Sequence, residues 1–340
     1  MPIGRIDSGN RHAIDAPAPP GLASTPTPRG DAMSELTVRV TDRRDVAQGV
    51  FALELSASGS GVLPSWTPGA HIDVHAGSVG TRQYSLCGDP ADERRWRIAI
   101  LREPAGRGGS EHLFQTALSG TELRVSLPRN NFELVASEEY VFIAGGIGIT
   151  PILPMVAAAE RAGTRWSLHY GARSREHLAF TGELQGYEHV NLLPQNESGL
   201  LPIASLLADT TAAVYCCGPA PLLDAVESEA ARRGLAVHTE RFTPRRVDNA
   251  VDRAFLVRLA HSGQVLSVAA DRTIVDVLEG AGVAIVTSCR EGTCGSCETT
   301  FLEGEVQHRD SVLTADERAH GRALMPCVSR ALSDVLVLDL

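Results

Sequence analysis

The sequence predicts a multidomain chain: an antiparallel β-barrel, then a doubly wound α/β parallel sheet, then a small α+β domain. Residues 34–136 contain short strands of alternating polarity separated by turns, which is typical of a barrel. Residues 137–242 alternate strands with helices, the pattern of a parallel sheet. After a linker at 243–252, residues 253–340 combine a hairpin, a helix, a closing strand and four cysteines. A length of 340 residues suits two or three domains.

Residues 1–33 are predicted to form a disordered tail. The segment is rich in Pro, Gly, Ser and Thr and has no apolar periodicity, so it cannot bury enough surface to order itself. A strand begins soon after Met33, and translation therefore starts at Met1 or at Met33. We expect no part of the chemistry in this tail.

The barrel region carries two motifs that together predict a flavin site. We expect strands at 36–40, 50–55, 71–75, 82–86 and 95–102, and a helix at 111–115. Within the fourth strand, Arg82 offers a guanidinium fork to a phosphate, Tyr84 can lie along a flavin ring, and Ser85 can hydrogen-bond it. The N–H groups of Gly108-Gly109-Ser110, at the start of the helix, form a second anion cradle. Arg82-Gln83-Tyr84-Ser85 alone is more typical of a half-exposed strand than of a cofactor site; its position before the next motifs favours the flavin.

The parallel-sheet region predicts a ligand at the carboxyl ends of its strands. Strands are expected at 140–144, 166–170, 190–193, 213–216 and 235–242, with helices near 174–184, 202–208 and 219–233. A further helix should follow the first strand, with Thr150 as its N-terminal cap and Pro151 at its first position.

Two glycine-marked strand ends in this sheet can form a floor for a nicotinamide. The first is the turn that contains Gly145, Gly146 and Gly148, and the second is Cys217-Gly218-Pro219. Neither matches the G-x-G-x-x-G dinucleotide fingerprint, so each alone is weak evidence. Of the two adjacent cysteines, Cys216 is predicted to lie in the core and Cys217 at the site.

The third region holds a loop that predicts a 2Fe–2S cluster. Its spacing is C-x4-C-x2-C followed by a distant fourth cysteine, which is the plant-type ligand pattern. Gly292 and Gly295, with the small residues Thr293 and Ser296, allow the backbone to approach the cluster and to aim N–H groups at its sulfurs. The alternatives are a structural zinc site and reduced core cysteines, although structural zinc usually takes two C-x2-C-like pairs and only one is present. The predicted metal ligands are Cys289, Cys294, Cys297 and Cys327.

Composition excludes several classes of function. A net charge of −10 argues against a nucleic-acid partner. The chain contains no Lys, which excludes a Walker lysine and Schiff-base chemistry. No apolar run approaches the length of a membrane span, and no signal-peptide pattern opens the chain. Cysteines arranged as cluster ligands indicate a reduced, cytoplasmic protein with no membrane partner.

Residues 36–340 resemble the phthalate dioxygenase reductase family, which includes the vanillate demethylase reductases. The five motifs above occur in the family's order. The resemblance implies an FMN barrel, an NAD domain and a β-grasp-like 2Fe–2S ferredoxin domain. It implies FMN contacts at Arg82, Gln83, Tyr84, Ser85, Gly108, Gly109, Ser110 and Thr150. For the nicotinamide nucleotide it implies Gly145, Gly146, Gly148, Cys217, Gly218 and Pro219, with Arg173 near the adenosine end and Phe242 close to the flavin.

The sequence thus predicts an electron-transfer enzyme. Electrons would pass from NADH to FMN, then to the 2Fe–2S cluster, and finally to a partner Rieske-type non-haem iron oxygenase. NADPH stays open, because Arg173 and Arg175 suit either a pyrophosphate or a 2′-phosphate. One alternative is a self-contained reductase of a small-molecule acceptor, and another is a binding module in which the cysteines hold zinc. No acid–base residue is obligatory for hydride transfer between stacked rings, so positioning is the protein's main task.

Overall fold

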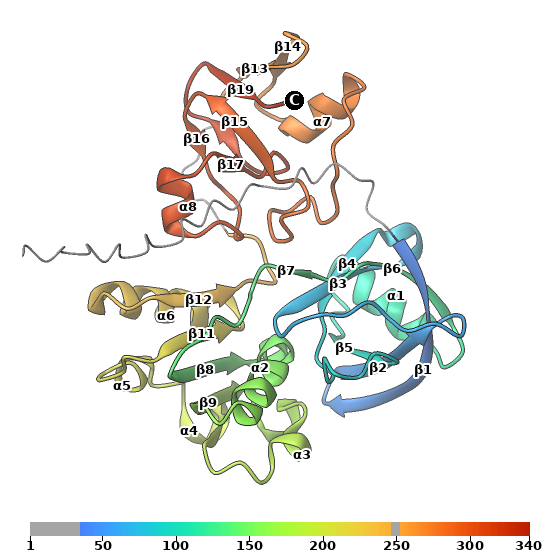
Figure 1. Cartoon of the computed structure of the whole chain (residues 1–340), viewed down its shortest axis with the longest axis vertical. Helices are drawn as coiled ribbons and strands as arrows, with labels where there is room; N and C mark the ends of the chain where they lie inside the picture. Colours follow the sequence, from blue (N-terminus) through green and yellow to red (C-terminus); the bar gives the residue numbers. More distant parts are fainter. Residues whose placement is uncertain (1–34, 246–251) are drawn as a thin grey trace, which may run out of the picture. The chain divides into compact units, whose positions relative to one another are not determined.

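The computed structural model describes residues 35–245 and 252–340, all of which lie in one unit that extends from Ala32 to Leu340. The predicted tail at 1–33 and the middle of the predicted linker, 246–251, lie outside the described residues. Three sheets follow one another along the chain, as the sequence predicts (Figure 1).

The first sheet is an antiparallel barrel. It runs in the order β4-β3-β6-β1-β2-β5, and β7 pairs with β3. A bridge between Leu86 and Ile98 joins the strands at the two ends of this order and closes the ring. The elements are β1 (Glu35–Ala47), β2 (Val50–Ala57), β3 (Ala70–His75), η1 (Gly77–Val79), β4 (Thr81–Ser85), β5 (Trp96–Leu101), α1 (Gly109–Thr116), β6 (Glu122–Ser126) and β7 (Arg129–Asn130).

Alternation along β3 separates the barrel core from a second buried surface. Ile72 and Val74 are fully buried among the apolar side chains of the barrel core. His71 and Asp73 project to the opposite face because successive strand residues alternate. They are nonetheless only 4% and 1% exposed. This polar face of β3 is therefore covered by other parts of the chain.

The second sheet is wholly parallel, in the order β10-β9-β8-β11-β12, which is a doubly wound topology. In Figure 1 its strands run side by side, and α2 and α6 flank them. The strands are β8 (Glu139–Gly145), β9 (Arg165–Ala172), β10 (Val190–Pro194), β11 (Ala213–Cys217) and β12 (Val237–Glu240). The helices are η2 (Gly146–Gly148), α2 (Ile149–Arg161), η3 (Arg175–His177), α3 (Thr181–Leu184), α4 (Gln195–Ser198), α5 (Ile203–Leu206) and α6 (Ala220–Arg233).

The predicted cap of α2 is wrong. Thr150 is the second residue of this helix, whose cap position is Gly148, and no side chain caps it. The Thr150 hydroxyl donates instead to the carbonyl of Ile147, at 2.9 Å. The glycine turn is itself helical, so the chain enters α2 through the η2 turn and needs no side-chain cap.

The third sheet belongs to the cysteine-rich domain. It runs β14-β13-β19-β15-β17, and a separate ribbon joins β16 to β18. Thr273 and Asp276 form a capping box at the start of α7, which agrees with a helix in this region. The elements are β13 (Phe255–Leu259), β14 (Val265–Val268), α7 (Ile274–Gly280), β15 (Thr299–Glu303), β16 (Val306–Gln307), α8 (Ala315–His320), β17 (Ala323–Leu324), β18 (Arg330–Ala331) and β19 (Val335–Leu338).

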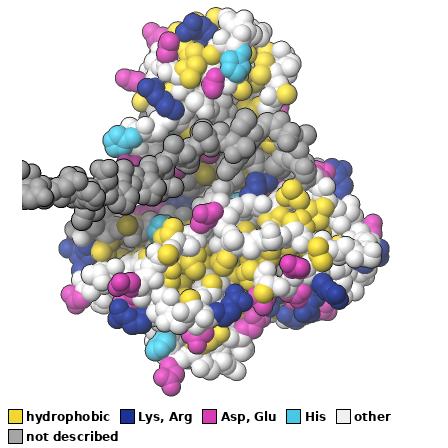
Figure 2. Space-filling view, viewed as in Figure 1, with side chains coloured by type: hydrophobic (Ala, Val, Ile, Leu, Met, Phe, Trp, Pro, Cys, Tyr) yellow, Lys and Arg dark blue, Asp and Glu magenta, His cyan; other side chains and the backbone are white. Residues whose placement is uncertain are grey.

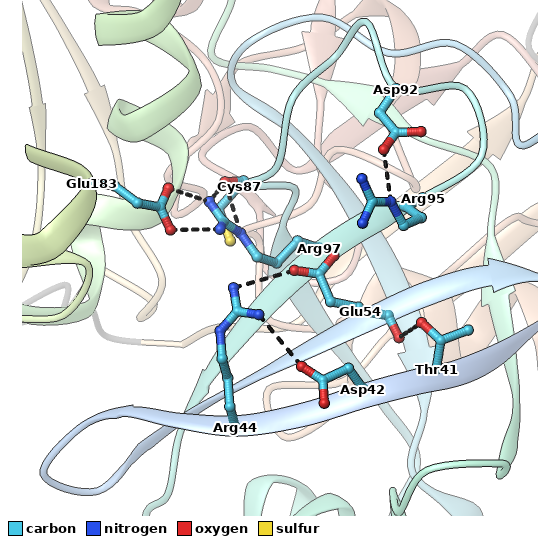
Figure 3. A network of polar contacts seen from close by, with 9 residues as sticks. All are labelled: Thr41, Asp42, Arg44, Glu54, Cys87, Asp92, Arg95, Arg97 and Glu183. Atoms are coloured by element: carbon cyan, nitrogen blue, oxygen red, sulfur yellow. Dashed lines mark hydrogen bonds and ion pairs between the residues drawn. The ribbon is translucent and has the colours of Figure 1, made fainter.

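The barrel and the parallel sheet share a hydrophobic core. Val50 and Ala52 of the barrel belong to the same buried cluster as Phe142 and Ile152 of the parallel sheet region. At its edge, the Arg97 guanidinium binds the Glu183 carboxylate at 2.6 and 2.9 Å and also donates to the Cys87 carbonyl (Figure 3). Apolar burial and a charged fork thus hold these two regions together.

Charged side chains on the face shown in Figure 2 are of both signs and interspersed, without a large basic patch. Among residues 35–245 and 252–340, no helix has the length and apolar character required to span a bilayer.

Candidate functional site

One cavity brings together residues from all three sheet regions. Eight of the predicted cofactor residues line it, and Cys289, a predicted cluster ligand, lines it as well. The eight are Arg82, Gln83, Tyr84, Ser85, Gly109, Ser110, Thr150 and Phe242. The expected flavin position is therefore next to the expected cluster position.

Arg82 is held as a fixed fork at one end of this cavity. Its guanidinium donates to the carbonyls of Thr81 and Arg107, at 2.8 and 3.1 Å. It has no carboxylate partner among the described residues, so its charge is available to a phosphate. A Cβ on Gly109 would lie 2.5 Å from the Arg82 Nε, so glycine is required for this close approach.

The Gly108-Gly109-Ser110 segment supplies the predicted cradle. Gly108 adopts φ 82°, a left-handed conformation that favours glycine, and is the cap residue of α1. No side chain of the described residues caps this eight-residue helix, so its first N–H groups, beside the Arg82 guanidinium, can meet a ligand. Both features suit a single phosphate group.

Ser85 provides the observation that best tests the fit of a flavin. Its hydroxyl is buried and has no hydrogen-bond partner among the described residues. Such a group is costly unless a ligand satisfies it. The neighbouring Tyr84 is half-buried, and burial raises the pKa of its phenol, so it stays neutral. A ring with hydrogen-bonding edges and an apolar face fits these residues.

The two glycine-marked strand ends lie against each other. β8 and β11 are neighbours in the sheet, with Ala144 opposite Cys217. A Cβ on Gly148 would lie 2.2 Å from the Cys217 carbonyl oxygen, and one on Gly218 would lie 3.0 Å from the backbone of Gly145. These glycines are not among the residues that line the cavity, and neither are Gly146, Cys217 and Pro219. They therefore serve the packing of the turn as well as any approach by a ligand.

The adjacent cysteines occupy opposite faces of β11. Cys216 and Cys217 are both 0% exposed, and they lie in different core clusters. The buried position of Cys216 agrees with the core role predicted for it. Burial also raises the pKa of the Cys217 thiol well above its ordinary value, so it stays protonated.

Glu240 lines the cavity, and sequence reasoning missed it. It lies opposite Cys217 at the carboxyl end of β12, and its Oε2 is inaccessible and has no hydrogen-bond partner among the described residues. Burial raises its pKa to about 8, so the carboxyl is largely protonated at neutral pH. The one feature of the sequence that could have indicated this role is the place of Glu240 near the end of a strand, two residues before Phe242.

Arg241 fixes the segment that carries Phe242. Its guanidinium is buried and binds the carboxylates of Asp224 and Glu227 on α6, at 2.6 and 2.9 Å. Phe242 itself is 40% exposed and lines the cavity. The Phe242 ring is thus held at the cavity by its neighbour Arg241, whose buried guanidinium binds two carboxylates of α6.

The two arginines after β9 differ in their contacts. Arg175 forms a bidentate pair with Glu197, with distances of 2.8 and 2.6 Å from its Nε and Nη2. The Arg173 side chain is exposed and forms no hydrogen bond or ion pair with the part of the chain that the structure describes. Only Arg173 is therefore free to meet an anionic ligand without first losing an ion pair.

The four predicted ligand cysteines converge. The Cys289 thiol contacts those of Cys294 and Cys327, and Cys297 contacts Cys327. These contacts lower the pKa of Cys289 and raise the pKa of Cys327. The described residues contain no group of three or more His, Cys, Asp or Glu arranged around a single ion. Paired thiols fit a two-iron cluster, in which each iron takes two of them.

Backbone N–H groups point at two of the sulfurs, and one of them belongs to the predicted Ser296, although neither belongs to a glycine. Glu291 N donates to the Cys289 Sγ at 3.3 Å, and Ser296 N donates to the Cys294 Sγ at 3.4 Å. Gly292 and Gly295 have φ of 71° and 72° and permit the loop's close contacts instead. The donor set, with N–H groups directed at thiolate positions, fits a cluster.

His71 is a second residue that sequence reasoning missed. It lines the cavity, and both ring nitrogens are buried without a partner among the described residues. Burial, followed by the charge of Arg129, lowers its pKa to about 4, so the ring is neutral. No pattern in the sequence distinguishes it from an ordinary strand histidine.

Comparison with known proteins defines the class. Residues 257–332 match the 2Fe-2S iron-sulfur cluster binding domain. The chain is 41% identical over 314 residues to the phenoxybenzoate dioxygenase subunit beta of Ectopseudomonas oleovorans, covering 91% of this chain and 98% of that protein. It is 40% identical over 312 residues to the vanillate O-demethylase oxidoreductase of Pseudomonas putida, covering 88% and 98%.

Solved structures agree. Phthalate dioxygenase reductase, described as a modular structure for electron transfer from pyridine nucleotides to [2Fe-2S], aligns with a TM-score of 0.65 and 36% identity over 90% of this chain and 98% of that chain. A type IV self-sufficient cytochrome P450 monooxygenase aligns with a TM-score of 0.83 and 39% identity over 90% of this chain. This chain spans 41% of that P450 chain.

The fold and the cysteine loop define an oxidoreductase with flavin, pyridine-nucleotide and 2Fe–2S domains, of the type found as reductase components of two-component oxygenases. The chain belongs to the phthalate dioxygenase reductase and vanillate O-demethylase reductase family. The cysteine loop is accordingly a 2Fe–2S site, and the zinc alternative is set aside.

Proposed function

We propose that this protein passes electrons from NADH through FMN and a 2Fe–2S cluster to a Rieske-type non-haem iron oxygenase. The observation that carries the proposal is the single cavity lined by Tyr84 and Ser85, by Phe242, and by Cys289. When bound, FMN accepts electrons in a pair and the cluster takes them singly, and that chemistry belongs to the cofactors. The protein's residues hold the reacting groups close together and limit water in the cavity.

Each domain has a proposed extent and task. Residues 34–136 would bind FMN, 137–242 the nicotinamide nucleotide, and 253–340 the cluster through Cys289, Cys294, Cys297 and Cys327. The three sheets, which lie within these limits, support this division. Arg82 and the α1 N-terminus together suit one phosphate, which favours FMN over FAD.

NADH is the proposed electron donor. Binding of a 2′-phosphate benefits from an unpaired cation, whereas the Arg175 guanidinium is occupied by Glu197. Arg173 is left to meet the pyrophosphate or the adenosine end. The Glu197 pair therefore supports a preference for the nucleotide without a 2′-phosphate.

The partner is proposed from the relatives. The two curated relatives compared above are named as parts of a dioxygenase and a demethylase. The cytochrome P450 monooxygenase that aligns with this chain suggests haem monooxygenases as a second class of acceptor for a reductase of this kind.

The test separates the flavin from the cluster. Cys327→Ser leaves three thiolates, and the variant is compared with the parent for NADH-dependent reduction of ferricyanide and of cytochrome c. Ferricyanide drains the flavin directly, so its reduction should persist, whereas cytochrome c reduction should fall to a small fraction. Equal cytochrome c reduction by both proteins would contradict the proposal. The parent should also support turnover by a purified Rieske-type oxygenase.

A further inference from the structure

The loop that carries three cluster cysteines is held by side chains of the flavin barrel. Among the described residues, three contacts join the loop to the barrel. They involve Glu291, Thr293 and Cys294 of the loop. The Arg107 guanidinium forms an ion pair with Glu291. The Thr293 hydroxyl donates to the Gln83 Oε1 at 3.4 Å, and the Asn131 Nδ2 donates to the main-chain carbonyl of Cys294 at 2.9 Å.

These contacts differ in strength. The Arg107 side chain is 59% exposed, so water and salt weaken its ion pair. The contact from Thr293 is long for a hydrogen bond. The Asn131 contact has ordinary length and directly engages the backbone of a cluster ligand that is only 2% exposed.

Asn131 is held between two immobilised neighbours. The side chain of Asn130 donates to the Thr67 hydroxyl at 2.8 Å and to the Pro68 carbonyl at 2.9 Å, and its Oδ1 accepts from Phe132 N at 2.9 Å. Phe132 is 3% exposed, and its ring packs on that of Tyr215, with centroids 5.5 Å apart. The backbone on each side of Asn131 is thus fixed, and the direction of its side chain is limited.

The cluster loop is shaped to accept Asn131. At Gly295, the residue after the engaged carbonyl, a Cβ would lie 3.1 Å from the Asn131 Nδ2. Its φ of 72° also favours glycine. The absence of a side chain there opens the path to the Cys294 carbonyl. Asn131 and Gly295 are therefore complementary, although 164 positions separate them in the sequence.

The Gln83 contact ties the same loop to the flavin strand. Gln83 donates from its Nε2 to the buried Asp73 at 3.1 Å, and the Arg129 guanidinium binds the same carboxylate oxygen at 2.8 Å. The Gln83 side chain therefore contacts both the polar surface of β3 and the cluster loop. Arg82 and Tyr84, its neighbours in β4, line the cavity. A displacement of the loop would change its position relative to this strand.

We propose that Asn131 is a positioning residue for electron transfer from the flavin to the cluster, with Gln83 in a supporting role. The inference rests on the proposed function, because it assumes that the flavin reduces the cluster. Asn131 touches no sulfur, so it acts on the position of the loop and not on the electronic properties of the cluster. The rate of electron transfer depends on the position of the cluster relative to the flavin, as the rates of other reactions depend on how the reacting groups approach each other.

The test uses the intact protein with flavin and cluster bound. The parent, Asn131→Leu and the matched control Asn191→Leu, which alters an exposed residue of β10, are mixed rapidly with NADH without oxygen. Flavin bleaching should keep the parent rate in all three. Cluster bleaching should slow about threefold to tenfold in Asn131→Leu alone, as expected for a docking equilibrium that loses one hydrogen bond. The cluster's midpoint potential should stay unchanged.

A measurement independent of turnover accompanies the kinetics. Hydrogen exchange of the peptide 288–297 should be faster in Asn131→Leu than in the control, because the loop loses its barrel contact. Parent-like bleaching and exchange would overturn the inference. So would slower bleaching with a shifted potential, which would mean that Asn131 tunes the cluster.

If Asn131→Leu loses its cluster, the smaller change Asn131→Ser is used with the same expected results. A parent protein whose cluster is not reduced after its flavin would refute the proposed function itself. Failure of the proposed function is thus distinguished from failure of the Asn131 inference, which requires a competent parent.

Discussion

The Arg97 guanidinium of the barrel binds both carboxylate oxygens of Glu183 in the parallel-sheet region, at 2.6 and 2.9 Å (Figure 3). The Arg97 side chain is 11% exposed, and it also lies 4.8 Å from the centroid of the Phe180 ring. Removing the carboxylate leaves a largely buried charge with only carbonyl and ring partners. A buried charge that loses its partner is costly.

Glu183→Gln should therefore destabilise the protein by about 1–3 kcal/mol, less than a fully buried pair because Glu183 is partly exposed. Urea unfolding followed by tryptophan fluorescence measures the change. The control is Glu138→Gln, which makes the same change at an exposed position. Equal stability of the two variants would mean that Arg97 is satisfied without Glu183.

Arg82→Ala should weaken flavin binding. The variant loses a charge-assisted phosphate contact of about 1.5–3 kcal/mol, which corresponds to roughly one to two decades in affinity. Titration of the flavin-free protein with FMN, followed by fluorescence, measures it. Arg95→Ala, at an exposed arginine paired with Asp92, should bind FMN like the parent. Iron content should not change, and loss of iron with flavin would show that the two sites do not assemble independently.

Glu240→Gln should alter the dependence of stability on pH. Burial raises the pKa of Glu240 from 4.5 to about 8, so the folded protein holds this proton more tightly than the unfolded chain. Its contribution is fully present below pH 4.5 and is lost as pH rises through about 8. The slope is at most about 1.4 kcal/mol per pH unit.

Gln cannot ionise, so the stability of Glu240→Gln relative to the parent should rise with pH across this interval. Urea midpoints measured at several pH values from 5 to about 9 provide the comparison. A constant difference between the two proteins would indicate that the Glu240 carboxyl is ionised throughout. The same substitution should leave FMN content unchanged, because Arg82 and the α1 cradle are unaltered.

Glu197→Gln should shift the nucleotide preference. Arg175 would lose its carboxylate partner and become available to a 2′-phosphate. The ratio of kcat/KM for NADPH to that for NADH should rise about twofold to tenfold. Glu188→Gln, an exposed residue in the same region, is the matched control. An unchanged ratio would place the 2′-position away from Arg175.

The domain order was predictable because each sheet has its own periodicity. Alternation along 71–75 and the short segments between turns indicate antiparallel strands, and β3 occupies that position. Alternating strands and helices beyond Glu139 indicate the parallel sheet, whose order is doubly wound. The boundaries were less accurate: the helix expected at 174–184 is the separate η3 and α3, and Thr150 lies inside α2.

The roles proposed for the nucleotide residues stay predictions. Gly145, Gly148 and Gly218 also allow close backbone contacts, and these contacts are sufficient to require glycine. A motif seen in sequence does not distinguish a residue that meets a ligand from one that permits the turn beside it. The Arg82 and Ser85 side chains, in contrast, line the cavity.

Strand and helix periodicity and the C-x4-C-x2-C spacing are local properties of the chain, so the class of each domain and the cluster ligands could be predicted from the sequence. Which distant residues act together depends on the tertiary structure. His71 and Asn131 carry no local signal, because the burial of His71 and the Cys294 partner of Asn131 come from segments far away in the chain. Asn131 approaches the Cys294 carbonyl because its neighbours are fixed by Thr67, Pro68 and Tyr215, and because Gly295 leaves the space open. Such contacts depend on packing in three dimensions, and a one-dimensional pattern does not contain them.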